Sequence, residues 1–120
     1  MNILLIEDDP TDLKLLSAVL RTDGHRVREH ASAEAAMEEV KSRRPEVILL
    51  DLRLPGIDGL ALARRFKSDP DTRDIPIVAL TAAPEVFSRE AAMAAGCDAF
   101  IVKPIDTRKL PGAVTAVAKG

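Results

Sequence analysis

Four apolar runs of this sequence each stop on polar residues that could take part in chemistry. These residues are Glu7 and Asp8 after residues 3–6, Asp51 after residues 47–50, Thr81 after residues 77–80, and Lys103 after residues 100–102. Three carboxylates that lie together repel one another, and a metal ion or another cation is the ordinary means of keeping them ionised. Carboxylate oxygens without a paired histidine suit Mg²⁺, which commonly binds through one or two carboxylates together with a phosphate.

A lysine and a threonine beside such carboxylates would complete a site for phosphoryl transfer. The ammonium of Lys103 offers a point charge for phosphoryl oxygens, and the hydroxyl of Thr81 offers a hydrogen bond. The remaining carboxylate could act as a nucleophile and form an aspartyl-phosphate. A metal ion and an ammonium around an in-line displacement are the usual apparatus of this reaction. A single charge at the end of a strand arises readily by chance, whereas five such groups in one chain do not.

The apolar runs predict strands, because they are too short for ordinary helices and have no polar face. Segments of helical periodicity alternate with them, for example residues 13–20 and 33–40. Residues 25–30 alternate in polarity, as expected of an edge strand. The sum is an α/β fold, (βα)₅, with a doubly wound parallel sheet in the flavodoxin-like order 2-1-3-4-5. In that order the first and third strands are neighbours, and a ligand crevice lies between their carboxyl ends.

Local signals predict where the helices begin and end. Asp9 precedes Pro10, so we interpret Asp9 as the N-cap of the first helix and not as a metal ligand. By the same reasoning, Asp58 caps the third helix. The fourth helix is expected over about residues 85–95. Pro111 cannot lie inside a regular helix, so the last helix either begins late, with Pro111 in its first turn, or kinks there.

Composition narrows the class of protein. The 120 residues are 47% apolar, which suffices for one domain over residues 1–120, with an aliphatic core because Trp and Tyr are absent. A net charge of −2 gives no electrostatic reason to expect a nucleic acid or an anionic membrane as partner. Cys97 is the single cysteine, which excludes an intrachain disulfide, and its small neighbours predict a buried position. No apolar stretch is long enough for a membrane span and no signal peptide is recognisable, so a cytoplasmic location is expected.

Four segments of the sequence carry a resemblance to a known family. They are Leu5–Asp9, Leu50–Gly59, Leu80–Ala82 and Gly96–Ile105. In this order and at this spacing they resemble the receiver domains of two-component response regulators, the CheY-like family. The resemblance extends over the whole chain.

The resemblance implies roles for the residues at the ends of the strands. Asp51 would accept the phosphoryl group. Asp8, Asp51 and the backbone carbonyl of Arg53 would ligate Mg²⁺ directly, and Glu7 would act through a metal-bound water. Lys103 would contact the phosphoryl oxygens.

The resemblance also implies a switch. Thr81 and the backbone of Ala82 would contact the phosphoryl group, and Phe100 would then turn inward behind Thr81. The bond between Lys103 and Pro104 would be cis. The signalling surface would lie within residues 84–118.

The same resemblance implies partners and kinetics. A sensor histidine kinase or a histidine phosphotransfer protein would supply the phosphate, and a downstream protein or a second copy of the chain would bind the activated surface. The chain would not be an enzyme beyond its own phosphorylation and dephosphorylation. Arg53 and Ala83 hold the positions that tune dephosphorylation, and Ala83 cannot position an attacking water, so slow dephosphorylation is expected.

Three alternatives compete with this interpretation. A phosphatase of the haloacid dehalogenase type would need a second aspartate where this chain has Arg53. A degenerate receiver that binds partners without phosphorylation conflicts with the intact set of polar residues. A flavodoxin-type cofactor binder would need a glycine- or hydroxyl-rich loop after the first strand. The end of the chain without a linker favours a stand-alone regulator over an excised receiver, while the kinase, target and oligomeric state stay open.

Overall fold

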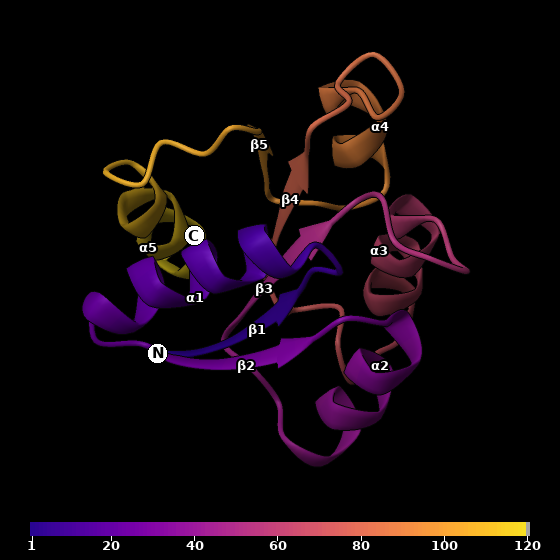
Figure 1. Cartoon of the computed structure of the whole chain (residues 1–120). Helices are drawn as coiled ribbons and strands as arrows, with labels where there is room; N and C mark the ends of the chain where they lie inside the picture. Colours follow the sequence, from indigo (N-terminus) through magenta and orange to yellow (C-terminus); the bar gives the residue numbers. More distant parts are fainter. Residues whose placement is uncertain (120) are drawn as a thin grey trace.

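A computed structural model describes residues 1–119 and shows a central parallel sheet with helices on both faces (Figure 1). The strands are β1 (Asn2–Ile6), β2 (Arg26–His30), β3 (Val47–Asp51), β4 (Ile77–Thr81) and β5 (Ala99–Val102). The helices are α1 (Pro10–Thr22), α2 (Ala33–Ser42), α3 (Gly59–Ser68), α4 (Arg89–Ala94) and α5 (Leu110–Lys119). The strand order is β2-β1-β3-β4-β5 and every pair is parallel, which confirms the predicted fold.

Two apolar cores hold the helices on the sheet. Successive residues of a strand point to opposite faces, so Leu4 and Ile6 join one core while Ile3 and Leu5 join the other. The first core takes up α2, α3 and α4, and the second takes up α1 and α5. Both cores consist mainly of aliphatic side chains, as the composition predicted.

The side chains of Asp9 and Asp58 cap the N-termini of α1 and α3, as the sequence predicted. One carboxylate oxygen of Asp9 accepts the N–H of Thr11 at 2.9 Å, and Pro10 is the first helical residue. Asp58 accepts the N–H of Leu60 at 2.7 Å at the start of α3. Asp9 and Asp58 therefore both act as helix caps.

Helix α4 is shorter than predicted. It begins at Arg89 and not near residue 85. The N–H groups of Val86 and Phe87 both donate to the carbonyl of Ala83, which forms a tight turn before the helix. Ser88 then accepts the N–H of Ala91 at 3.1 Å and caps α4. The serine was the helix-start signal that the sequence interpretation overlooked.

The structure decides between the two alternatives at Pro111. Helix α5 begins at Leu110, so Pro111 lies in the first turn, where its missing N–H costs no intrahelical bond.

Cys97 is buried as predicted, and this burial, together with the charge of Asp98, raises the pKa of its thiol to about 11. The thiol is thus protonated and unreactive at neutral pH. No helix within residues 1–119 is both long and apolar enough to cross a membrane.

Candidate functional site

A cleft of about 400 Å³ lies at the carboxyl ends of β1, β3, β4 and β5. It contains most of the polar residues predicted from the strand ends. Its lining comprises Asp8, Asp9, Asp12, Asp51, Arg53, Thr81, Ala82, Ala83, Glu85 and Lys103. The parallel register produces this convergence, because it aligns the last residues of neighbouring strands.

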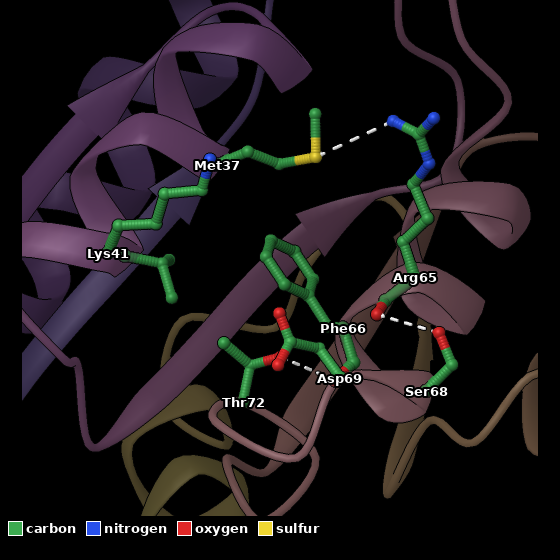
Figure 2. Close-up of a pocket in the computed structure, with 8 residues that line it drawn as sticks. Met37, Lys41, Arg65, Phe66, Ser68, Asp69 and Thr72 are labelled. Atoms are coloured by element: carbon green, nitrogen blue, oxygen red, sulfur yellow. Dashed lines mark hydrogen bonds between the residues drawn. The ribbon is translucent and has the colours of Figure 1, made fainter.

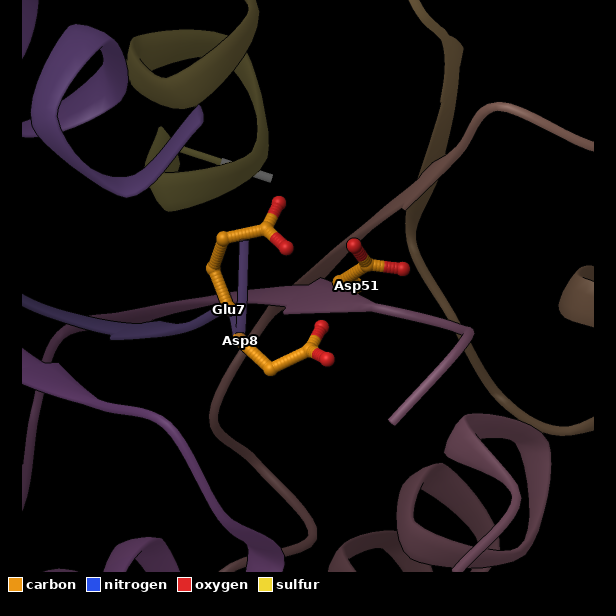
Figure 3. A group of neighbouring side chains, drawn as sticks. All are labelled: Glu7, Asp8 and Asp51. Carbon is orange, nitrogen blue, oxygen red and sulfur yellow. The ribbon is translucent and has the colours of Figure 1, made fainter. Parts of the chain in front are cut away.

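Three carboxylates meet at one side of the cleft. Pairing of Ile6 with Leu50 places Glu7 and Asp8 beside Asp51. Oxygen atoms of the three side chains lie within 4.8 Å of one another (Figure 3). Glu7 and Asp51 are buried, whereas Asp8 is exposed. Three hard oxygen donors at this spacing, one of them open to solvent, fit the ligand preference of Mg²⁺.

Lys103 neutralises part of this negative charge. Its ammonium donates to Glu7 at 2.5 Å, to Asp51 at 2.9 Å and to Asp12 at 2.8 Å. The backbone N–H of Lys103 donates to the carbonyl of Thr81 at 2.7 Å, and the bond to Pro104 is cis, as the resemblance implied. These contacts hold the ammonium at the bottom of the cleft.

The pKa values of the two buried carboxyl groups, Glu7 and Asp51, are shifted in opposite directions. Burial and the hydrogen bond with Asp51 raise the pKa of Glu7 to about 8, against the effect of Lys103. Burial also opposes ionisation of Asp51, but hydrogen bonds from Glu7, Lys103 and Arg53 outweigh it and lower its pKa. Burial lowers the pKa of Lys103, but the hydrogen bonds to its carboxylate partners raise it by more, so the net shift is upward. Asp51 is therefore an ionised carboxylate beside an ammonium, which is the state that a nucleophile needs.

A tightly folded loop after β3 orients Asp51. The N–H of Arg53 donates to Asp51 at 2.8 Å, and Arg53 pairs with Asp58 across the loop. The N–H of Gly59 donates to the carbonyl of Leu52 at 2.9 Å. A Cβ atom at Gly59 would lie 2.4 Å from the Cα of Leu52, so this closure of the loop requires glycine.

The predicted switch residues lie beside the cleft. The hydroxyl oxygen of Thr81, 1% exposed, accepts the N–H of Ala83 at 2.9 Å. Phe100 is already packed in the core with 9% exposure, and the guanidinium of Arg89 lies 5.4 Å from its ring centre. Because Phe100 is buried here, its inward turn on activation stays a prediction.

Two cleft residues were missed by sequence reasoning. Asp12 lies one turn after Asp8, in the first turn of α1, and contacts Lys103. Asp8 precedes the helix, so helical spacing does not relate the two residues, and the contact of Asp12 with Lys103 has no local signal in the sequence. Glu85 lines the mouth of the cleft because α4 begins four residues later than predicted. No local signal in the sequence marked Glu85.

A second cavity, of about 300 Å³, lies at the far end of α3 from the cleft (Figure 2). Phe66 and Met37 contribute apolar surface between α2 and α3, and Arg65 lies over the sulfur of Met37 at 3.7 Å. Its charged groups are exposed, and it has no cluster of buried titratable side chains. This cavity therefore lacks the grouped buried carboxylates and ammonium that the acidic cleft contains.

Comparisons with known proteins agree with this architecture. A family profile described as the response regulator receiver domain matches residues 3–115. The transcriptional regulatory protein AfsQ1 of Streptomyces coelicolor is 36% identical over 118 residues, which are 98% of this chain and 51% of that protein. The chain spans about half the length of the first curated relatives that it matches.

Solved structures show the same fold. A putative response regulator from Chloroflexus aurantiacus superimposes with a TM-score of 0.94 at 33% identity, covering 99% of this chain and 98% of that one. The receiver domain of the sensor histidine kinase PA1611 from Pseudomonas aeruginosa has a TM-score of 0.90 at 32% identity, with 99% and 98% coverage. That structure has a magnesium ion coordinated in its active-site cleft. With its strand order, its acidic cleft and these relatives, the chain belongs to the receiver domain family of two-component response regulators.

Proposed function

We propose that this chain accepts a phosphoryl group on Asp51 in a Mg²⁺-dependent reaction and signals through contacts with other proteins. The observation that carries the proposal is the position of Asp51, whose side chain lines the acidic cleft between the N–H of Arg53 and the ammonium of Lys103. Arg53 N–H and the ammonium of Lys103 hold its two oxygens at 2.8 and 2.9 Å. Attack by this carboxylate on an acyl phosphate or a phosphohistidine would form the aspartyl-phosphate and release the donor's leaving group.

Mg²⁺ would be held by Asp8, Asp51 and the backbone carbonyl of Arg53, with Glu7 acting through a water molecule. The spacing of the three carboxylates supports this ligand set, as does the magnesium ion in the PA1611 receiver. When bound, the ion would offset negative charge between the carboxylates and the phosphoryl group. Lys103 would contact the phosphoryl oxygens, with Thr81 and the backbone of Ala82 on the other side.

A histidine kinase or a histidine phosphotransfer protein would donate the phosphate. The surface that would change on phosphorylation lies on α4, β5 and α5. Val86 in the turn before α4, Met93 on α4 and Val102 on β5 are 59%, 38% and 44% exposed, which provides apolar area for a downstream protein or for a second copy of the chain. The chain would act on no substrate other than its own phosphoryl group.

Removal of single carboxylates distinguishes a metal ligand from a helix cap. Asp8→Asn is expected to weaken Mg²⁺ binding at least about tenfold, because it removes a direct charged ligand. Asp9→Asn is expected to change the affinity less than about twofold, because asparagine is an equally good N-cap. Isothermal titration calorimetry with MgCl₂ measures both affinities. Equal losses in the two variants would contradict the proposed ligand set.

The lifetime of the phosphoryl group is expected to depend on Ala83. This residue lines the cleft but has no polar atom in its side chain that could position a water. Ala83→Glu is expected to accelerate dephosphorylation about tenfold, which is less than the roughly 100-fold or more of a fully positioned general base because the new side chain has no partner that orients it. The measurement is phosphate release from the purified phosphoprotein after removal of the donor, with Ala83→Gln as a neutral comparison. An unchanged release rate in Ala83→Glu would refute the role of this position.

A further inference from the structure

Asp12 forms an ion pair with Lys103 although it is neither a strand-end residue nor a helix cap. Its carboxylate, in the first turn of α1, accepts a hydrogen bond from the ammonium of Lys103 at 2.8 Å. This contact joins residues 91 positions apart and links α1 to the end of β5. The side chain of Lys103 is only 9% exposed, so the ion pair lies largely out of solvent.

The ammonium of Lys103 has no donor to spare. A lysine carries three N–H groups, and Glu7, Asp12 and Asp51 each accept from Lys103. A phosphoryl oxygen can therefore bind this ammonium with full hydrogen-bond geometry only if one of the three carboxylates is released.

The released carboxylate is best identified by its access to water. The Glu7 side chain is fully buried and the Asp51 side chain is 8% exposed, so leaving either group without its hydrogen bond from Lys103 would be costly. The side chain of Asp12 is 33% exposed and can be hydrated once Lys103 leaves it. Asp51 is also the residue to which the phosphoryl group would be attached, which keeps Lys103 near it.

We propose that Asp12 is a positioning residue that holds Lys103 in the resting cleft and competes with the phosphoryl group for its third N–H. The proposal rests on the proposed phosphorylation of Asp51. No covalent bond changes at Asp12: the hydrogen bond from Lys103 passes from a carboxylate oxygen to a phosphoryl oxygen, and water takes its place at Asp12. Asp12 thereby slows phosphorylation, and its release uncouples the start of α1 from the end of β5.

Phosphorylation rates test the competition. At saturating Mg²⁺, Asp12→Ala is expected to accept phosphate from acetyl phosphate about threefold to tenfold faster than wild type, the equivalent of the net contribution of one ordinary hydrogen bond. Asp12→Glu, which keeps the carboxylate, is expected to restore a slow rate. Asp9→Asn removes a charge from the same cleft without touching Lys103 and is expected to change the rate less than about twofold. Equal acceleration by Asp12→Ala and Asp9→Asn, or a slower rate in Asp12→Ala, would overturn the proposal.

Mg²⁺ binding tests the Asp12–Lys103 contact without any phosphorylation. Freed from Asp12, Lys103 competes more strongly with Mg²⁺ for Glu7 and Asp51, so Asp12→Ala is expected to weaken Mg²⁺ binding about threefold or more. In a Lys103→Met background the same substitution is expected to have a clearly smaller effect. Equal effects in both backgrounds would overturn the proposal even in a chain that is phosphorylated. If the effect of Asp12→Ala on Mg²⁺ binding depends on Lys103 but no phosphate adduct forms on the protein, the proposed function is rejected and the positioning contact is retained.

Discussion

A Lys103→Met variant is expected to accept phosphate from acetyl phosphate about 100-fold more slowly than wild type, the usual cost of losing one donor to a developing anion. Methionine keeps much of the length and apolar surface of the lysine but has no charge. The ammonium lies 2.9 Å from Asp51, where the phosphoryl group would be attached, and it is buried enough to act in a medium of low dielectric constant. The rate is measured by intact mass against time.

The same variant is expected to bind Mg²⁺ about tenfold more tightly, because an ammonium that competes for the oxygens of Glu7 and Asp51 has been removed. The opposite signs separate this effect from general damage to the cleft, which would weaken both activities. Lys109→Met, at an exposed lysine outside the cleft, serves as the matched control and is expected to change neither quantity. A parallel loss of Mg²⁺ affinity and phosphorylation rate in Lys103→Met would contradict the assigned role.

Gly59→Ala is expected to destabilise the protein by about 2 to 3 kcal/mol, a typical cost of forcing an atom into a packed site. The new Cβ would meet three backbone atoms of Leu52, the nearest at 2.4 Å, and no rotamer change can relieve a contact with backbone. The loop would have to open, and it carries the Arg53 N–H that orients Asp51. Weaker Mg²⁺ binding should therefore accompany the loss of stability.

Gly112→Ala is the matched control for this substitution. Gly112 lies in α5, and a Cβ atom there would have no neighbour within 4 Å. Alanine favours a helix more than glycine does, so this variant is expected to gain about 0.5 to 1 kcal/mol. Urea denaturation monitored by circular dichroism measures both changes. Equal stability of the two variants would show that the close approach of Gly59 to the backbone of Leu52 is not required for stability.

The sequence predicts the sheet and its strand order because both follow from the pattern of apolar and polar residues along the chain. Fully apolar runs identify the inner strands, and the alternating run at residues 25–30 identifies the edge strand β2. Because the strands are parallel, their carboxyl ends lie at one edge of the sheet, and the sequence pattern alone groups Glu7, Asp51 and Lys103 there. Caps such as Asp9 were equally accessible, because an N-cap acts on N–H groups only two or three residues away.

The remaining features depend on geometry that no local pattern encodes. The contact between Asp12 and Lys103 spans 91 positions and depends on how α1 is tilted against the end of β5. The late start of α4 results from a tight turn that closes on the carbonyl of Ala83. The raised pKa of Glu7 arises from burial against Asp51, a quantity that appears only when the strands are packed. Sequence reasoning therefore identified the groups but not how they share their hydrogen bonds.

The central claim is that Asp51 is the residue that accepts phosphate. The most direct test is to incubate wild type and Asp51→Asn with acetyl phosphate and Mg²⁺ and to measure the intact mass of each. Asparagine keeps the shape of the side chain but removes the nucleophilic carboxylate. We expect one phosphate on the wild type, none when Mg²⁺ is chelated, and none on Asp51→Asn. A wild type without an adduct, or an adduct that persists in Asp51→Asn, would contradict the claim.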